Sequence, residues 1–326
     1  TFISPFRTAF MAACEEQGFK YNPDYNGAYQ YGVSPAQFTI KNGARHSGAG
    51  AFLHPAMKRP NLTVLTNTKT TEVLLKKDRA TGISTIDKKG RTTHFQATKK
   101  VILSAGAFNS PQLLMLSGIG DREELKELGI NCKHELPGVG KNLQDHLFVP
   151  VGALANEQSG QNHYHRPWQK IKALLEYYTK KTGVFTSGPL EAMAFGSSSR
   201  SPDRVDYQFQ YSSMQAGSDY SVDFHDIDTF PRADGFSILP TLLRPESVGS
   251  LTLRSKNPAD QPVIQPNFFD SENDRRVMIE ACKKAVDVLE SSAYDQYRTS
   301  MLTIDNKSST DEIWHHIQRQ VETVYH

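Results

Sequence analysis

The alternation of apolar and polar positions predicts a chain built from short strands and capped helices. Between residues 61 and 104, short β-prone runs are separated by turn residues such as Lys88-Lys89-Gly90, which predicts a β-meander. Beyond residue 151, apolar and polar side chains alternate over 205–211, 236–239 and 250–254. A period of two is typical of half-buried strands, so these segments predict a mostly antiparallel sheet.

Helices are predicted where apolar residues recur every three or four positions behind a capping residue. Such helices are expected to begin at Ser4-Pro5, Ser110-Pro111, Asp121, Ser271 and Ser309. A further amphipathic helix is marked by one apolar stripe: Ile171, Leu174, Leu175 and Tyr178. On the last helix, neighbours His315 and His316 diverge by about 100°, so they make no ligand pair and solvent exposure is expected for both.

The stretch from residue 101 to residue 146 carries the most informative local pattern. A short apolar run, Val101-Ile102-Leu103, predicts a buried strand, and the small residues 104–107 follow it. Capped helices follow these residues. The order of strand, glycine turn and helix is typical of nucleotide-binding α/β units, in which the free N–H groups at the helix start bind an anion. An ordinary strand and helix without a ligand has the same local pattern, so the pattern alone leaves both interpretations open.

Composition narrows the classes of function. The chain has 326 residues, of which 38% are hydrophobic and 22% charged, which is typical of a globular protein with about two domains. A net charge of +2 without a basic cluster argues against nucleic-acid binding. No apolar stretch reaches the roughly 18 residues of a membrane span. Cys14, Cys132 and Cys282 are too scattered for a disulfide framework or a metal site, and they favour a reducing compartment such as the cytoplasm, although localisation stays open.

Three stretches resemble one known family. Residues 106–120 read GAFNSPQLLMLSGIG and are followed by PGVGKNLQDH, which resembles the second signature of the glucose–methanol–choline (GMC) oxidoreductases, flavin enzymes that oxidise alcohols. Residues 244–269 are similar to the start of that family's carboxy-terminal region. The closing Glu322-Thr323-Val324-Tyr325-His326 is similar to the phrase that contains the family's catalytic histidine.

The resemblance implies a mixed α/β (α+β) fold. It consists of a partial FAD-binding Rossmann-like domain and a substrate domain with a mostly antiparallel sheet flanked by helices. Residues 1–44 are assigned to a substrate-domain segment, 45–150 to the FAD-binding segment and 151–326 to the substrate domain, which ends at the active-site histidine. No G-x-G-x-x-G run occurs, although the family needs one for the flavin pyrophosphate. We therefore interpret the chain as an internal fragment that binds FAD weakly or not at all and is inactive alone.

The resemblance also implies site residues. FAD is expected to meet the chain at Thr70, Ala105 and Gly106, and small residues after a strand independently leave room for a ligand at the last two. Glu191, in a phrase similar to the family's substrate-pocket loop, is expected to line the pocket and to favour a choline-like or small polar alcohol. His326 is expected to be the catalytic base. No metal site is expected.

The implied reaction is oxidation of an alcohol to an aldehyde or ketone. His326 takes the hydroxyl proton, for which an imidazole with an ordinary pKa of about 6.5 is suited, and a hydride passes to the flavin. Oxygen or a quinone-like carrier then accepts the electrons. Two alternatives stay open: a member of the family with other flavin chemistry, such as light-driven decarboxylation of fatty acids, and a non-catalytic binding module made from part of the fold.

Overall fold

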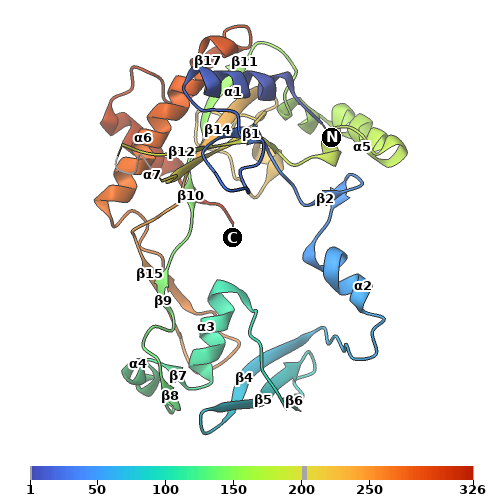
Figure 1. The fold of residues 1–326 in the computed structure, drawn as a ribbon, viewed down its shortest axis with the longest axis vertical. Helices are drawn as coiled ribbons and strands as arrows, with labels where there is room; N and C mark the ends of the chain where they lie inside the picture. The colour runs from blue at the N-terminus through green and yellow to red at the C-terminus, as the bar shows by residue number, and fades with distance from the viewer. Residues whose placement is uncertain (1, 200–203, 326) are drawn as a thin grey trace. The chain divides into compact units, whose positions relative to one another are not determined.

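The computed structural model describes residues 2–199 and 204–325 (Figure 1). The chain divides into two units. Unit 1 contains Thr1–His54, His146–Glu246 and Ser271–His326, and unit 2 contains Pro55–Asp145 and Ser247–Asp270. The segment Ser247–Asp270, which the sequence analysis grouped with residues 151–326, thus lies in unit 2. The assignment of the two units to a substrate domain and an FAD-binding domain stays a prediction.

Unit 1 is built on an eight-stranded sheet in which every pairing is antiparallel. The order is β1-β12-β13-β14-β10-β18, and β11 joins β14 to β17. The strands are β1 (Gly32–Pro35), β10 (Leu147–Phe148), β11 (Val151–Ala155), β12 (Leu190–Gly196), β13 (Tyr207–Ser212), β14 (Gly235–Leu242), β17 (Arg298–Met301) and β18 (Glu322–Thr323). Every residue of the central β14 is buried, so the expectation of a half-buried strand at 236–239 is wrong, because both faces of this strand are covered. The predicted antiparallel sheet is confirmed.

Four longer helices belong to unit 1: α1 (Pro5–Glu16), α5 (Pro167–Lys180), α6 (Glu272–Leu289) and α7 (Thr310–Gln320). The predicted caps are confirmed, because the hydroxyls of Ser4, Ser271 and Ser309 each accept a hydrogen bond from the first turn of their helix. Helix α1 buries Phe10, which stacks on Tyr211 with ring centroids 4.5 Å apart. Aromatic stacking of this kind fixes the helix against the sheet.

Shorter elements complete unit 1. They are β2 (Ile40–Lys41), β3 (Ala44–Arg45), the π-helical turn η1 (Ala49–Leu53) and the 3₁₀ turns η2 (Asn162–His165), η3 (Val184–Thr186), η4 (Ile227–Thr229) and η5 (Ser292–Tyr294). Strands β2 and β3 pair with each other only, as a two-stranded ribbon. Helix α2 (His54–Ala56) begins at the last residue of this segment of unit 1, and its other two residues belong to unit 2.

Unit 2 contains the predicted meander and a second small sheet. The meander is β4 (Thr68–Lys76), β5 (Arg79–Asp87) and β6 (Thr92–Gln96), and the second sheet orders β16 (Val263–Gln265), β15 (Gly249–Thr252) and β9 (Lys141–Leu143). The remaining elements are α3 (Gly106–Leu116), α4 (Arg122–Glu127) and the parallel pair β7 (Ile119–Gly120) and β8 (His134–Glu135).

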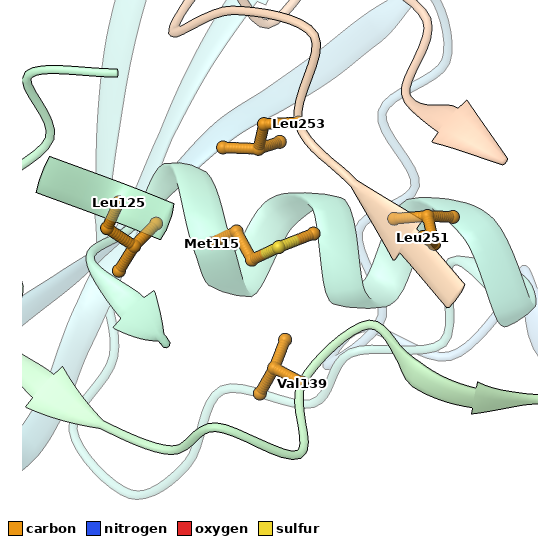
Figure 2. Close-up of a cluster of buried hydrophobic side chains, with 5 residues drawn as sticks. All are labelled: Met115, Leu125, Val139, Leu251 and Leu253. Carbon is orange, nitrogen blue, oxygen red and sulfur yellow. The ribbon is translucent and has the colours of Figure 1, made fainter. Parts of the chain in front are cut away.

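Five apolar side chains form the core of unit 2 (Figure 2): Met115, Leu125, Val139, Leu251 and Leu253. They come from α3, α4, the turn before β9 and β15, so the core joins segments far apart in the sequence. Gly140 makes this approach possible. Its φ is +79°, and a Cβ built there would lie 2.1 Å from the carbonyl oxygen of Leu251, so only glycine fits.

Several predictions of local structure are wrong. Val101–Leu103 forms no strand with any described residue, and Ile102 is 82% exposed. A β-strand requires a neighbouring strand that forms hydrogen bonds with its backbone. None of the described residues pairs with residues 101–103 in this way. Helix α3 begins at Gly106, so Pro111 lies inside it, and the Ser110 hydroxyl accepts from the Ala105 N–H (3.1 Å). The predicted strand at 250–254 is β15, which pairs in unit 2 and not in the large sheet.

The expected exposure of His316 is also wrong. His315 is exposed, but His316 is only 1% exposed and its Nε2 donates to the carbonyl of Pro150 (2.9 Å). The two residues point in different directions, as their spacing predicts, and α7 presents His316 together with the buried Ile313 and Ile317. Burial lowers the pKa of His316, because desolvation disfavours the charged imidazolium.

Candidate functional sites

An apolar cavity of about 320 Å³ lies against the sheet of unit 1. Its wall comes from β10, β12, β13, β14, the loop between β13 and β14, and the end of the chain. The lining residues are Phe148, Pro150, Pro189, Leu190, Gln210, Ser212, Met214, Ala216, Phe224, Ile227, Phe230, Ser237, Leu239, Val324 and Tyr325. None of these carries a charge at neutral pH, and the size suits a small organic molecule.

Four aromatic rings form one side of this cavity. Phe148 meets Phe224 edge to face, with centroids 5.4 Å apart, and Phe224 meets Phe230 in the same way at 5.6 Å. Tyr325 completes the set at 6.3 Å from Phe148. Edge-to-face pairs of this kind contribute about 0.5–1.5 kcal/mol each beyond the area they bury. The rings therefore hold the loop that carries Phe224 and Phe230 against strand β10.

One polar atom in the cavity wall lacks a partner. The Ser237 side chain is 3% exposed, and its hydroxyl makes no hydrogen bond with the described residues. A buried hydroxyl without a partner costs about 1–3 kcal/mol. Since Ser237 lines the cavity, a polar group of a bound ligand is a suitable partner for it.

Residues 322–325, the last that the structure describes, lie beside this cavity. Strand β18 pairs with β10, and the N–H of Val324 donates to the carbonyl of His146 at 3.1 Å. Tyr325 has a φ of +62°, in the left-handed region that a tyrosine rarely adopts. Burial raises the pKa of the Tyr325 phenol, and the charges of Glu322 and Asp223 raise it further. The predicted base His326 lies outside the described residues, and its role stays a prediction.

His146 makes a contact that joins two segments of unit 1. Its Nε2 lies 3.0 Å from the carbonyl oxygen of Leu243, at the end of β14. The ring thereby joins the segment before β10 to the segment after β14.

Glu191 is buried and bound by protein donors. Its carboxylate accepts from the Ser4 N–H (2.8 Å), the Gln161 side-chain amide (3.1 Å) and the Ser213 hydroxyl. Ser4 is the N-cap of α1, so the negative charge stands at a helix start, where it is favourable. Its neighbour Leu190 lines the cavity, whereas Glu191 is not among the lining residues. Among the described residues, no contact with the cavity supports the predicted substrate role of Glu191.

The three predicted cofactor residues are brought together in unit 2. Thr70 on β4 and Ala105 before α3 line one cavity of about 510 Å³, and Gly106 follows Ala105 directly. The other lining residues are Lys69, Ile102, Leu103, Ser104, Asn109, Gln112, Leu113, Leu116, Pro258 and Gln261. Gly106 has a φ of +85°, and a Cβ added there would meet nothing within 4 Å. The space beside this turn is therefore open.

The chemistry of this second cavity fits part of a flavin nucleotide. Small residues at the turn leave backbone accessible, and Ile102 offers an apolar surface that is 82% exposed. The Gln112 side chain is tied to the carbonyl of Asp260 (2.8 Å), which fixes the far wall. Thr70 and Ala105 thus line one cavity and Gly106 follows at its edge, but their role in binding a cofactor stays a prediction, and a pyrophosphate-binding G-x-G-x-x-G run is absent from the sequence.

Other types of site were searched for in residues 2–199 and 204–325. Within these ranges, no group of three or more His, Cys, Asp or Glu side chains is arranged to hold a metal ion. None of the helices described there has the length and apolar character that a membrane crossing requires. Cys282 is fully buried on α6, and burial raises the pKa of its thiol, as is typical of a cysteine that packs in a core.

The sequence analysis missed the aromatic wall and Ser237. Phe224 and Phe230 lie in a loop rich in aspartate, where aromatic residues have no regular spacing. Their isolation in a polar loop was the available signal, because a large ring in such a segment needs a surface to pack on. Ser237 gave no signal, since serine is common in strands and only its position on β14 places it at the cavity.

The comparisons with known proteins identify the family. The amino-terminal and carboxy-terminal models of the GMC oxidoreductases match residues 2–148 and 245–326. The two matches together cover more than half of the chain, in the order found in the family. The chain belongs to the GMC oxidoreductase family.

Individual relatives agree with this assignment. An alcohol dehydrogenase [acceptor] of Pseudomonas putida is 36% identical over 334 residues, and the mitochondrial choline dehydrogenase of Homo sapiens is 36% identical over 323 residues. Each alignment covers 99% of this chain, but 58% and 53% of the respective relative. The chain thus spans about half the length of these relatives.

Solved structures share the fold. The structure of a formate oxidase of Aspergillus oryzae RIB40, which concerns modification of FAD in that enzyme, is similar to this chain. The TM-score is 0.87 at 25% identity, and the match covers 99% of this chain and 59% of the oxidase. A fungal aryl-alcohol oxidase matches with a TM-score of 0.81 and 18% identity, over 98% and 60%. The second likeness is evidence for the fold alone. The expected mixed α/β fold with mostly antiparallel sheets is confirmed.

Proposed function

We propose that this protein takes part in the oxidation of an alcohol to an aldehyde or ketone, with FAD as the cofactor that its family implies. The observation that carries the proposal is the cavity of unit 1. It is of suitable size, and it is bordered by Val324 and Tyr325, the residues directly before His326. FAD supplies the two-electron acceptor for the hydride when it is bound.

The residues of the chain have separate tasks in this proposal. The apolar wall with Phe148 and Phe224 holds the body of the alcohol and excludes water. The unpartnered hydroxyl of Ser237 binds a polar group of the substrate. His326 accepts the proton of the alcohol hydroxyl, since a neutral imidazole is a suitable base near pH 7. Thr70, Ala105 and Gly106 contact the cofactor.

The cavity favours an uncharged alcohol with an apolar body over a choline-like cation. A quaternary ammonium gains about 0.5–2 kcal/mol from an aromatic face. Moving its charge out of water costs several kcal/mol unless a counter-charge is present. No lining residue among those described supplies one, and the Glu191 carboxylate is bound to Ser4, Gln161 and Ser213. The electron acceptor, oxygen or a quinone-like carrier, is left open.

The test compares two proteins: this chain, and the longest reading frame that contains it. We expect the longer protein to carry FAD, and we expect an aryl or branched aliphatic alcohol to bleach its flavin spectrum under anaerobic conditions more readily than choline does. We expect this chain alone to bind FAD weakly and to be inactive.

Matched variants assign the base. His326→Ala should prevent bleaching by the alcohol, whereas His315→Ala, which removes an exposed histidine on α7, should leave it unchanged. The proposal would be contradicted if the alcohol bleached the flavin of the His326→Ala protein as readily as that of the unmodified protein. A preference for choline over every uncharged alcohol would also contradict it.

A further inference from the structure

Helix α5 presents its apolar side outward. Its exposed large side chains are Trp168 (82%), Ile171 (48%), Leu174 (38%), Leu175 (61%) and Tyr178 (70%). The side turned toward the protein carries Ala173, which is 3% exposed, and the half-buried Gln169, Glu176 and Tyr177. A helix that packs on a core by its hydrophobic stripe has the opposite arrangement.

The exposed side chains form one continuous stripe. At about 100° per residue, the positions from Leu174 through Tyr178, Ile171 and Leu175 to Trp168 cover an arc of about 120°. Lys170 falls at one margin of this arc and Lys172 at the other. In Figure 1 the helix lies at the periphery of the ribbon of unit 1. The stripe is thus an apolar surface with a cation on each side.

Most of the charges on and beside α5 are positive. Arg166, Lys170, Lys172, Lys180 and Lys181 are basic, and Glu176 is the one acidic residue from 166 to 181. Glu176 lies on the protein side and accepts a hydrogen bond from Thr182 (2.9 Å). Lys181 lies over the rings of Tyr177 and Tyr178. Lys170 is 3.9 Å from the exposed Asp228, a pair that water and salt screen strongly.

We propose that α5 (Pro167–Lys180) is a membrane-surface helix that docks on a bilayer containing anionic lipid. An apolar stripe bordered by lysines suits such an interface, because the side chains enter the acyl boundary while the ammonium groups stay at the headgroups. With 14 residues the helix is about 21 Å long, too short to cross a bilayer, so it lies in the plane of the interface.

A protein partner fits this surface less well. To cover the stripe, a protein would have to desolvate Lys170 and Lys172 at its margins, which is costly without paired carboxylates. Anionic headgroups supply these partners at any position along the helix. A second copy of this chain offers the same basic helix, so two copies would repel each other there.

The chain contains its own reporter of docking. Its two tryptophans are Trp168, in the stripe, and Trp314, whose ring lies near Arg275 on α6. In a Trp314→Phe protein, Trp168 emission should shift to the blue when phosphatidylcholine vesicles that contain phosphatidylglycerol are added. Pure phosphatidylcholine vesicles should produce a smaller shift.

Further substitutions in the Trp314→Phe protein test the apolar stripe and the flanking lysines separately. Ile171→Asp with Leu175→Asp should abolish vesicle co-sedimentation, because charges cannot enter the acyl boundary. The control Tyr29→Asp with Phe52→Asp adds the same charge at side chains that are 84% and 78% exposed elsewhere, and should bind as before. Lys170→Glu with Lys172→Glu should weaken binding to the anionic vesicles about tenfold or more, since each basic residue contributes about 1 kcal/mol there.

Three results would overturn the proposal. The first is that the unmodified chain does not bind anionic vesicles. The second is that the Ile171→Asp, Leu175→Asp protein binds as well as its control. The third is a dimer in light scattering that these same two substitutions dissociate and that competes with vesicles, which would assign the stripe to a second copy of the chain. Circular dichroism of each variant checks that it is folded.

Discussion

The backbone N–H of Val324 donates a 3.1 Å hydrogen bond to the carbonyl of His146, although the two residues are far apart in the sequence. With the pairing of Leu147 to Thr323, this bond holds the end of the chain beside strand β10. Tyr325 is thereby set against Phe148 at the cavity. The segment that resembles the family's catalytic phrase and the cavity that suits a substrate are therefore neighbours.

The aromatic wall provides a prediction about substrate preference. Phe224 contacts both Phe148 and Phe230, so Phe224→Ala removes two edge-to-face pairs and opens the cavity. We expect kcat/KM for an aryl alcohol to fall about tenfold or more, with a smaller change for a short aliphatic alcohol that does not fill the space. Phe224→Leu, which keeps an apolar side chain, should lose less. Equal losses for both alcohols would argue against the cavity as the substrate site.

Substitution of Glu191 tests whether this residue stabilises the fold or binds the substrate. Glu191→Ala leaves the Ser4 N–H, the Gln161 amide and the Ser213 hydroxyl without their acceptor. We expect the free energy of unfolding to fall by about 3 kcal/mol, measured by urea denaturation, because each buried donor left unpaired costs about 1–3 kcal/mol and the site relaxes in part. The exposed Glu157→Ala is the control and should stay within about 0.5 kcal/mol. A stable Glu191→Ala protein with a raised KM for choline would instead support the role implied by the family resemblance.

Two glycines allow a matched test of the cofactor turn. Gly106 and Gly129 both have positive φ, +85° and +67°, and a Cβ at either would meet nothing within 4 Å. Alanine at each position should therefore lower the free energy of unfolding by a similar amount, about 1–2 kcal/mol, through backbone strain alone. Only Gly106→Ala should also weaken FAD binding, measured by flavin fluorescence in the longer protein. If Gly129→Ala weakens FAD binding equally, the effect is one of stability and not of contact.

The buried His316 predicts a dependence of stability on pH. Its folded-state pKa lies below the ordinary value of about 6.5, so the unfolded chain binds a proton at a pH where the folded protein does not. This contribution to stability is fully present above about pH 6.5 and is lost as the pH falls below it, with a slope of at most about 1.4 kcal/mol per pH unit. Burial also lowers the pKa of His165, which adds a change in the same direction.

Urea denaturation at several pH values between about 7 and 5 measures this slope. His316→Gln should reduce this slope, because one of the groups that titrate differently in the folded and unfolded states is gone. His315→Gln removes the exposed neighbour on the same helix and should leave the slope as it is. An unchanged slope in the His316→Gln protein would show that other groups cause the acid sensitivity.

Local chemistry made part of the fold predictable. The caps at Ser4, Ser271 and Ser309 could be predicted, because each serine precedes a segment with helical spacing of apolar residues. Its hydroxyl accepts a hydrogen bond from an N–H group in the first turn of the helix. The alternation in β13 and β14 was readable because side chains in a strand point to opposite faces. These signals depend on residues within a few positions of each other.

The remaining features depend on partners distant in the sequence. The helical spacing of the apolar residues on α5 was recognisable in the sequence. This spacing does not determine which side of the helix faces the protein, and in the structure the apolar side is exposed. Glu191 lies where the register shifts between Leu190 and Ala192, and no sequence rule places that shift. Ile102 lies in an apolar run of strand length, yet no described strand pairs with it.

The way the chain passes between its two units has a consequence for biosynthesis. Unit 2 ends at Asp270, whereas unit 1 needs residues from both ends of the chain. The Ser4 N–H at the start of α1 finds its acceptor on Glu191, 187 residues later, and Gln17 finds Ser291 274 residues later. A ribosome that works from the amino terminus therefore releases the segments Pro55–Asp145 and Ser247–Asp270 of unit 2 before it releases α6 and α7. Helix α1 must therefore wait for α6, against which it packs, and is open to chaperones until α6 has emerged.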